Sequence, residues 1–140
     1  DDDGFAAART GTQNRDWAGH HVGENFIALG NVLQGEHILT AIEDGYNANP
    51  DDEIEDRLMA AIEAGRDAGG QKGGQRSAAI LVYEDKEYAR VDLRVDAHEE
   101  PVGEMRRVFD FYKPAIEYYV HRQVDARVEP LSEAVPVEGY

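Results

Sequence analysis

The sequence predicts an α+β domain in which paired strands are separated by paired helices. Three observations support this prediction. Apolar residues recur at helical spacing over 36–48 and 50–65, they alternate with charged residues over 88–96, and two further apolar runs occupy 25–33 and 77–83. The resulting order is strand, strand, helix, helix, strand, strand, helix. That order favours an antiparallel or mixed sheet covered by helices on one face.

The first predicted strand covers residues 5–10 and follows a turn signal at Asp3-Gly4. Such a strand needs an incoming partner, and the residues before the turn are too few to supply one. We therefore expect Asp1 to lie inside a larger fold, at a point of cleavage or at the start of a separately made subunit. Residues 11–24 are polar and punctuated by glycine, which predicts a loop before the buried strand over 25–33.

Two helices are predicted next. Over 36–48 one helical face carries Ile38, Leu39, Ile42 and Tyr46. The second helix is predicted to begin at Pro50, with Asn49 as its cap. Its apolar stripe consists of Ile54, Leu58, Ala61, Ile62 and Gly65, the last small enough for close packing.

The glycine-rich segment 68–74 predicts a flexible connection to two further strands. The short apolar run at 77–83 follows these glycines, which favours a central strand over a helix. Over 88–96 valines and leucine alternate with arginines and aspartates, the pattern of a strand with one buried face.

A long helix is predicted over 102–124, and Pro114 should kink it. Residues 125–140 contain Pro130 and Pro136 and are predicted to form an extended tail. We therefore assign 1–124 to a single domain and 125–140 to its C-terminal tail.

Composition excludes several classes of function. The chain has 29 acidic and 14 basic residues, a net charge of −15 and no cysteine. This charge repels nucleic-acid phosphate, and no apolar run approaches the roughly 18 residues that span a bilayer. We expect a cytoplasmic protein that binds neither nucleic acid nor membrane. Only three basic residues are lysines; this balance suits a salt-adapted, halophilic protein, with an ordinary acidic protein as the alternative.

Two kinds of motif in the sequence have a chemical and a structural interpretation. The segment Gly69–Gly74 contains Lys72 but does not fit the phosphate-loop pattern and follows a helix, so a flexible connection is favoured. Two clusters contain metal-ligand residue types: His20, His21 and Glu24, and Asp92, Asp96 and His98. A polar loop and a solvated strand face also explain these clusters, and we predict neither a metal nor a cofactor.

A hydrolase triad of Ser77, His20 and Asp92 is conceivable, but Ser77 lacks the Gly-x-Ser-x-Gly elbow. Asn31 is more informative because it interrupts an apolar strand, where a side-chain amide is costly unless it has partners. Asn31 is suited to donate to a developing oxyanion, with Gly30 allowing close approach. The alternative, which the residues alone favour, is a buried amide bonded to a neighbouring strand or loop.

Four segments, in this order, resemble a known family: Trp17-Ala-Gly-His20, Gly30-Asn-Val-Leu33, Gly74-Gln-Arg-Ser-Ala-Ala79, and Asp92-Leu-Arg-Val-Asp96-x-His98 followed by Pro101-Val102. They are similar to the C-terminal part of the domain-of-unknown-function family 1028, whose members resemble Ntn (N-terminal nucleophile) hydrolases. The resemblance extends from about Asp1 to Phe111.

The resemblance implies an αββα sandwich of two sheets between two helical layers. This chain would supply the C-terminal part, with the first strands missing. The nucleophile of such enzymes is a Thr, Ser or Cys at the start of the first strand, so it would lie on a segment before Asp1. The chain would then be a subunit or fragment of an amidohydrolase that acts on a small amide. The alternative is a non-catalytic protein that keeps the fold for ligand binding or assembly.

The resemblance also implies roles for individual residues. Asn31 is the candidate catalytic residue, as oxyanion donor. Trp17 and His20 would line the substrate pocket, and Gln75 and Ser77 would orient substrate or nucleophile.

The expected partners are the N-terminal segment or partner chain of the same fold, a small-molecule substrate, and further copies of the chain in a homo-oligomer. Asp92 and Arg94 would form a structural ion pair. The tyrosines at 112, 118 and 119 suit either an oligomer interface or the core and rim of the last helix.

Overall fold

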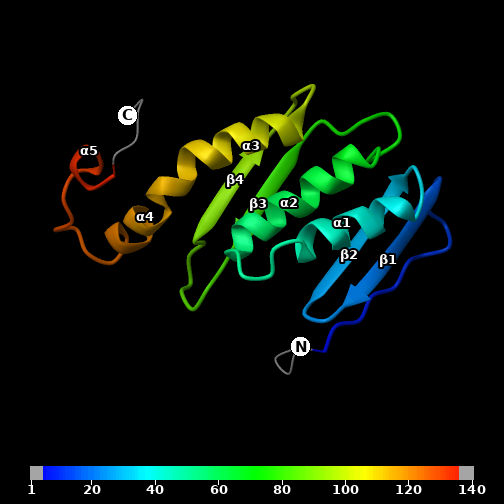
Figure 1. Cartoon of the computed structure of the whole chain (residues 1–140), viewed down its shortest axis with the longest axis horizontal. Helices are drawn as coiled ribbons and strands as arrows, with labels where there is room; N and C mark the ends of the chain where they lie inside the picture. The colour runs from blue at the N-terminus through cyan, green and yellow to red at the C-terminus, as the bar shows by residue number, and fades with distance from the viewer. Residues whose placement is uncertain (1–4, 136–140) are drawn as a thin grey trace. The chain divides into compact units, whose positions relative to one another are not determined.

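A computed structural model describes residues 5–135 (Figure 1). The chain divides into two compact units, Asp1–Arg76 and Ser77–Tyr140. Each unit contains a two-stranded antiparallel sheet and helices, which confirms the predicted α+β class. Among the described residues, no helix has the length and apolar character needed to cross a membrane.

The first unit begins with a β-hairpin. Strand β1 (Trp17–Gly23) pairs antiparallel with β2 (Phe26–Leu33) through a turn in which Asn25 adopts a φ of 66°. The predicted loop over 11–24 is therefore wrong in its second half. The strand forms through its pairing with β2 in spite of its glycines. Gly19 also leaves room for an aromatic ring, because a Cβ there would lie 2.5 Å from the indole of Trp17.

The prediction of a strand over 5–10 is also wrong, since residues 5–16 contain no strand. Three consecutive alanines occupy the middle of this segment, and alanine has a low strand propensity. The partner of β2 is β1 instead. The predicted turn at Asp3-Gly4 lies outside the described residues.

The hairpin has two faces of different character. The open face carries Ala18, His20, Val22, Ile27, Leu29 and Asn31, which the register places in three cross-strand pairs. Three apolar side chains on this face are exposed, with Leu29 at 67%. On the opposite face, Ala28 and Leu33 are buried. Near the end of β2, Val32 is an extra residue with a φ of 57°, a β-bulge that puts Leu33 on the buried face, opposite Trp17.

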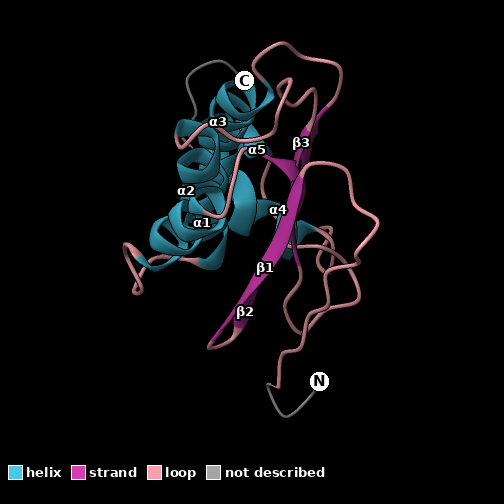
Figure 2. Cartoon of the chain, turned by 90° about the vertical axis from the view of Figure 1, so that its right-hand side faces the viewer, coloured by secondary structure: helices cyan, strands magenta, loops and turns pink. Residues whose placement is uncertain are grey.

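Helices α1 (His37–Asn47) and α2 (Ile54–Asp67) form a helical hairpin, and α1 packs on the buried face of β1–β2 (Figure 2). The core between α1 and the sheet consists of Ala28, Leu33, Ile38 and Leu39, bordered by Trp17, Phe26, Ile42 and Ala68. The two helices approach closely at glycines. A Cβ on Gly65 would lie 2.7 Å from the Ile42 side chain, as the sequence predicted for a small residue in this stripe.

The start of α2 differs from the prediction. The helix begins at Ile54 rather than Pro50, and Glu53 rather than Asn49 precedes its first residue. The intervening residues form a turn in which the Asp52 amide donates to the Asn49 carbonyl at 3.2 Å. Residues 50–53 offer no aliphatic side chain other than proline to the interface with α1, so the helix begins at the first apolar residue that packs.

The glycine-rich connection after α2 is fixed to the end of β2. The Lys72 amide donates to the Val32 carbonyl at 2.8 Å, and the Gln34 amide donates to the Gly70 carbonyl at 3.3 Å. Four of its glycines adopt positive φ: Gly69, Gly70, Gly73 and Gly74. The segment connects a helix to a strand, which agrees with the connecting role predicted for it.

In the second unit, β3 (Ala78–Val82) pairs antiparallel with β4 (Val91–Val95). The predicted alternation in β4 is confirmed, because its valines and leucine are buried and Asp92 and Arg94 are exposed. Helix α3 (Pro101–Tyr112) packs on this sheet and contributes Met105 and Phe109, both fully buried.

The predicted kink at Pro114 is confirmed. The 3₁₀ turn η1 (Lys113–Ala115) separates α3 from α4 (Ile116–Arg122). Within the predicted extended tail, the short helix α5 (Leu131–Ala134) is present, and residues 136–140 lie outside the described part of the chain.

Candidate functional site

A pocket of about 490 Å³ lies on the open face of the β1–β2 hairpin. The segment preceding the hairpin forms one side and the two strands form the other. Its lining residues are Ala7, Ala8, Arg9, Thr10, Gly11, Asn14, Ala18, Gly19, His20, Ile27, Leu29, Gly30 and Asn31. All of them belong to the first unit, and two of the residues predicted for the site, His20 and Asn31, are among them.

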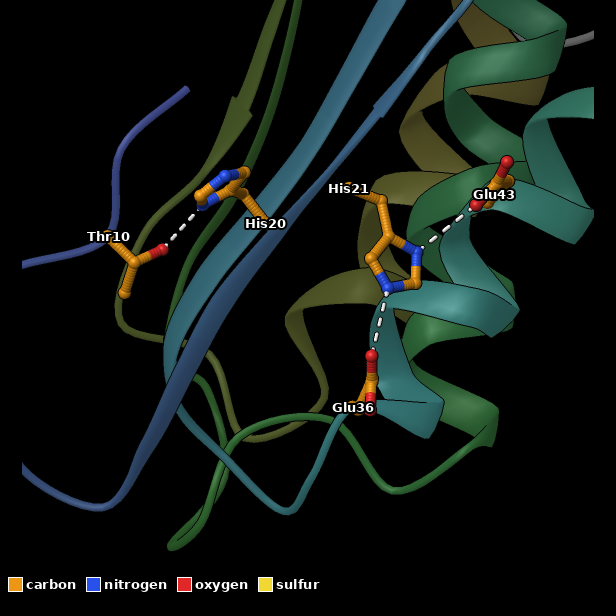
Figure 3. Close-up of polar contacts among 5 residues, drawn as sticks. All are labelled: Thr10, His20, His21, Glu36 and Glu43. Atoms are coloured by element: carbon orange, nitrogen blue, oxygen red, sulfur yellow. Dashed lines mark hydrogen bonds and ion pairs between the residues drawn. The ribbon is translucent and has the colours of Figure 1, made fainter. Parts of the chain in front are cut away.

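His20 is held within this pocket by a hydrogen bond to Thr10, with 2.6 Å between Thr10 Oγ1 and His20 Nδ1 (Figure 3). Both side chains are partly buried. A hydroxyl both donates and accepts, so Thr10 is able to serve either neutral tautomer of the ring and also its charged form. The contact therefore fixes the position of the His20 ring through Nδ1, and the second ring nitrogen, Nε2, is the one that would form a hydrogen bond with a ligand.

Asn31 lies on the open face, opposite Ala18, and its residue surface is exposed. The interpretation of Asn31 as a buried amide is therefore wrong, because strand alternation turns this residue away from the core. Asn31 and His20 line the same pocket from neighbouring strands. A primary amide and an imidazole offer hydrogen bonds to a carbonyl group placed between them.

His21 points to the opposite side of the hairpin (Figure 3). Its Nδ1 lies 3.1 Å from Glu43 Oε2, and its Nε2 lies 3.7 Å from Glu36 Oε1, so it links β1 to α1. The two neighbouring histidines are thus separated by the sheet and do not share an ion. Within residues 5–135, no group of three metal-ligating side chains is brought together.

The remaining predicted residues lie elsewhere. Trp17 packs at the border of the buried core cluster rather than in the pocket. Gln75 is next to Gly70, since its Oε1 would be 3.1 Å from a Cβ there. Ser77 is exposed and is the first residue of the second unit, which also contains Asp92, whereas His20 belongs to the first.

The predicted ion pair of Arg94 forms with Asp96 rather than with Asp92. Arg94 Nε and Nη2 each donate to the Asp96 carboxylate at 2.9 Å. These hydrogen bonds hold the pKa of Asp96 below its ordinary value. The arrangement is an exposed strand-face pair and indicates no ligand site.

Sequence reasoning missed Arg9, Thr10 and Asn14. Arg9 and Thr10 were assigned to a strand and Asn14 to the loop over 11–24, and none of the three was named as a site residue, although all three line the pocket. One signal was present in the sequence: Asn14 follows Gly11 by three residues, and its side-chain amide donates to the Gly11 carbonyl at 2.8 Å. This local turn shapes the segment that faces the hairpin.

The α+β fold thus carries, on the open face of its first sheet, a pocket lined by residues of one unit. The chain belongs to the family of unknown function DUF1028, whose model matches residues 1–105. This confirms the family predicted from the four sequence segments.

The solved structures similar to this chain include the crystal structure of protein SPO2555 from Silicibacter pomeroyi, also assigned to DUF1028. The two chains share 34% sequence identity with a TM-score of 0.68, over 79% of this chain and 46% of the other. The chain thus spans about half the length of that relative. A comparison with the curated proteins found no match.

Proposed function

We propose that the chain forms part of an Ntn-type hydrolase that cleaves a small amide. In this proposal it supplies the C-terminal part of an αββα sandwich, and a segment outside its 140 residues supplies the first strands. The observation that supports the proposal is a polar pocket on an exposed, otherwise apolar sheet face. In a sandwich of two sheets, such a face packs against a second sheet, and the exposed Val22, which lies outside the pocket lining, offers apolar surface for that packing.

The proposed reaction proceeds through an acyl-enzyme. A Thr, Ser or Cys at the start of the other segment attacks the amide carbonyl and loses its proton to its own amino group. Asn31 donates a hydrogen bond to the oxyanion that develops. The carbon–nitrogen bond then breaks, the amine leaves with the proton, and water hydrolyses the acyl-enzyme. His20, held by Thr10, orients the substrate beside Asn31.

A second function is ligand binding without catalysis. The observation that favours it is that every residue lining the pocket belongs to the first unit of this chain. A small molecule would then need no further segment to bind. This alternative keeps the same pocket and assigns it no nucleophile.

The first test is the intact mass of the protein purified from its source, measured under native and denaturing conditions. We expect a co-purifying segment of the same fold whose first residue is Thr, Ser or Cys, and a native mass of more than one copy. A chain that is folded and alone, or a partner that retains its initiator methionine, would contradict the hydrolase proposal and favour ligand binding. The measurement also tests the predicted homo-oligomer, and fractionation tests the predicted cytoplasmic location.

The second test is Asn31→Ala in the complete protein. Loss of an oxyanion donor lowers kcat by about two to three orders of magnitude. Because Asn31 is exposed in this chain, the same substitution should change the free energy of unfolding of the isolated chain by less than about 0.5 kcal/mol. Asn47→Ala, an exposed amide at the end of α1, is the matched control and should leave kcat unchanged. An unchanged kcat in Asn31→Ala would remove this residue from the mechanism.

A further inference from the structure

The pocket on the open face is free of acidic residues in a strongly acidic chain. Asp and Glu make up 29 of the 140 residues, yet none of the 13 residues that line the pocket is acidic. The lining contains instead one cation, Arg9, and the imidazole ring of His20. The charge of the lining thus differs from that of the whole chain, whose net charge of −15 would repel anions.

The polar and apolar parts of the lining are both suited to an anionic amide. Arg9 is able to bind a carboxylate through two parallel N–H donors, because a guanidinium presents its donors in a planar fork. The amide of Asn31 and the ring of His20 offer hydrogen bonds to a carbonyl. Ile27, Leu29 and the three lining alanines supply apolar surface for an aliphatic group.

We infer that this pocket binds a small amide that carries a carboxylate, of the class of N-acylated amino acids. The inference rests on the proposed amide hydrolase and adds the charge of its substrate. In it, Arg9 binds the carboxylate, Asn31 and His20 bind the amide carbonyl, and Thr10 positions His20. Arg9 thereby selects anionic amides over neutral ones of the same shape.

The test uses a matched pair of ligands, N-acetylleucine and N-acetylleucinamide, which differ only in a carboxylate and a neutral amide. Each is titrated into the full chain at low ionic strength, with binding followed by calorimetry and by the NMR signals of the His20 ring. We expect the carboxylate to bind about five- to tenfold more tightly than the neutral ligand. Both ligands should shift the signals of His20.

Arg9→Gln should abolish the preference for the carboxylate and leave binding of the neutral ligand unchanged. Arg15→Gln removes the same charge from the same segment but outside the pocket lining, so it is the matched control and should keep the preference. Thr10→Val should weaken both ligands, and Thr10→Ser, which retains the hydroxyl, should restore them.

Equal affinity for the two ligands would overturn the inference, and so would an equal loss of preference in Arg9→Gln and Arg15→Gln. The outcome is independent of turnover. If anionic amides bind with the expected preference and the complete protein fails to hydrolyse them, the hydrolase proposal fails and the ligand class stands. If amides are hydrolysed without regard to charge, the ligand class fails and the hydrolase proposal stands.

Discussion

Tyr112 lies at the end of α3 in an aromatic cluster. Its ring stacks on that of Tyr119, with 5.5 Å between centroids, and Tyr118 meets Tyr119 edge-on at 5.4 Å. Burial raises the pKa of Tyr112, and the nearby Tyr119 and Asp92 raise it further. The phenol therefore ionises less readily in the folded chain than in the unfolded chain.

This shift predicts a loss of stability at high pH. A group whose pKa is raised on folding contributes its full stability below the unfolded value of about 10, and the contribution is lost as pH rises through the folded value. We expect Tyr112→Phe to unfold with less pH dependence than the natural chain between about pH 9 and 11. Urea unfolding followed by circular dichroism measures this.

Tyr83→Phe is the control for Tyr112→Phe, because the ring of Tyr83 is exposed. It should leave the pH dependence of unfolding as it is in the natural chain. If Tyr112→Phe and the natural chain lose stability in parallel above about pH 10, burial of the Tyr112 ring does not contribute to alkaline unfolding.

The sequence indicated some residues of the candidate site and missed others for identifiable reasons. Asn31 was recognisable because an amide interrupts an apolar strand, although strand alternation places it on the exposed face. Thr10 was not recognisable, because its partner His20 lies ten residues away and their contact depends on the path of a segment without regular structure. Trp17 was assigned to the pocket, but its large ring packs at the border of the buried core cluster instead.

At the level of elements, the contact between α1 and α2 depends on glycine. A Cβ on Gly45 would lie 2.8 Å from the Ala60 carbonyl oxygen and 2.8 Å from the Ala64 Cβ, so the helices would have to separate. We expect Gly45→Ala to destabilise the chain by about 1–2 kcal/mol, because the overpacking cost exceeds the gain in helix propensity. Fluorescence of Trp17, the only tryptophan in the chain, reports unfolding of this unit.

Gly103→Ala is the matched control for Gly45→Ala. Gly103 also lies within a helix, α3, but a Cβ there would have no neighbour within 4 Å. The same substitution should therefore stabilise the chain by about 0.5–1 kcal/mol. Destabilisation at both positions, or at neither, would contradict the close packing of α1 on α2.

Elements whose hydrophobic period is sustained were predictable, and those defined by glycine or by a distant partner were not. The alternation in β4 and the stripe of α1 each identify an element without tertiary information. Strand β1 contains two glycines and two histidines, and only its pairing with β2 makes it a strand. The start of α2 was misplaced because the Asn-Pro cap signal also fits the turn that precedes the helix.

At the level of the whole molecule, the net charge of −15 predicts a dependence of stability on salt. Like charges repel across the surface, and salt screens them with a Debye length of about 10 Å at 0.1 M and about 3 Å at 1 M. We expect the Tm to rise by about 5 °C or more between low salt and 1 M KCl, measured by circular dichroism.

The shape of the salt curve distinguishes the two interpretations of the acidic composition. Screening alone should be nearly complete below about 0.5 M, so the Tm of an ordinary acidic protein levels off there. A salt-adapted protein should continue to gain stability above 1 M and should lose its fold on dialysis into low salt. Indifference to salt over the whole range would contradict both.

The extra residue at Val32 has a further consequence for which side chains of β2 reach the core. Up to Asn31, alternate side chains of β2 line the pocket or face the core, where Ala28 is buried. After the extra residue, Leu33 faces the core as well, next to the Gly70–Lys72 backbone. The bulge thus shifts by one residue the alternation that determines which side chains of β2 face the core. Without the extra residue, regular alternation would turn Leu33 to the open face and away from Ile38 and Leu39 of α1.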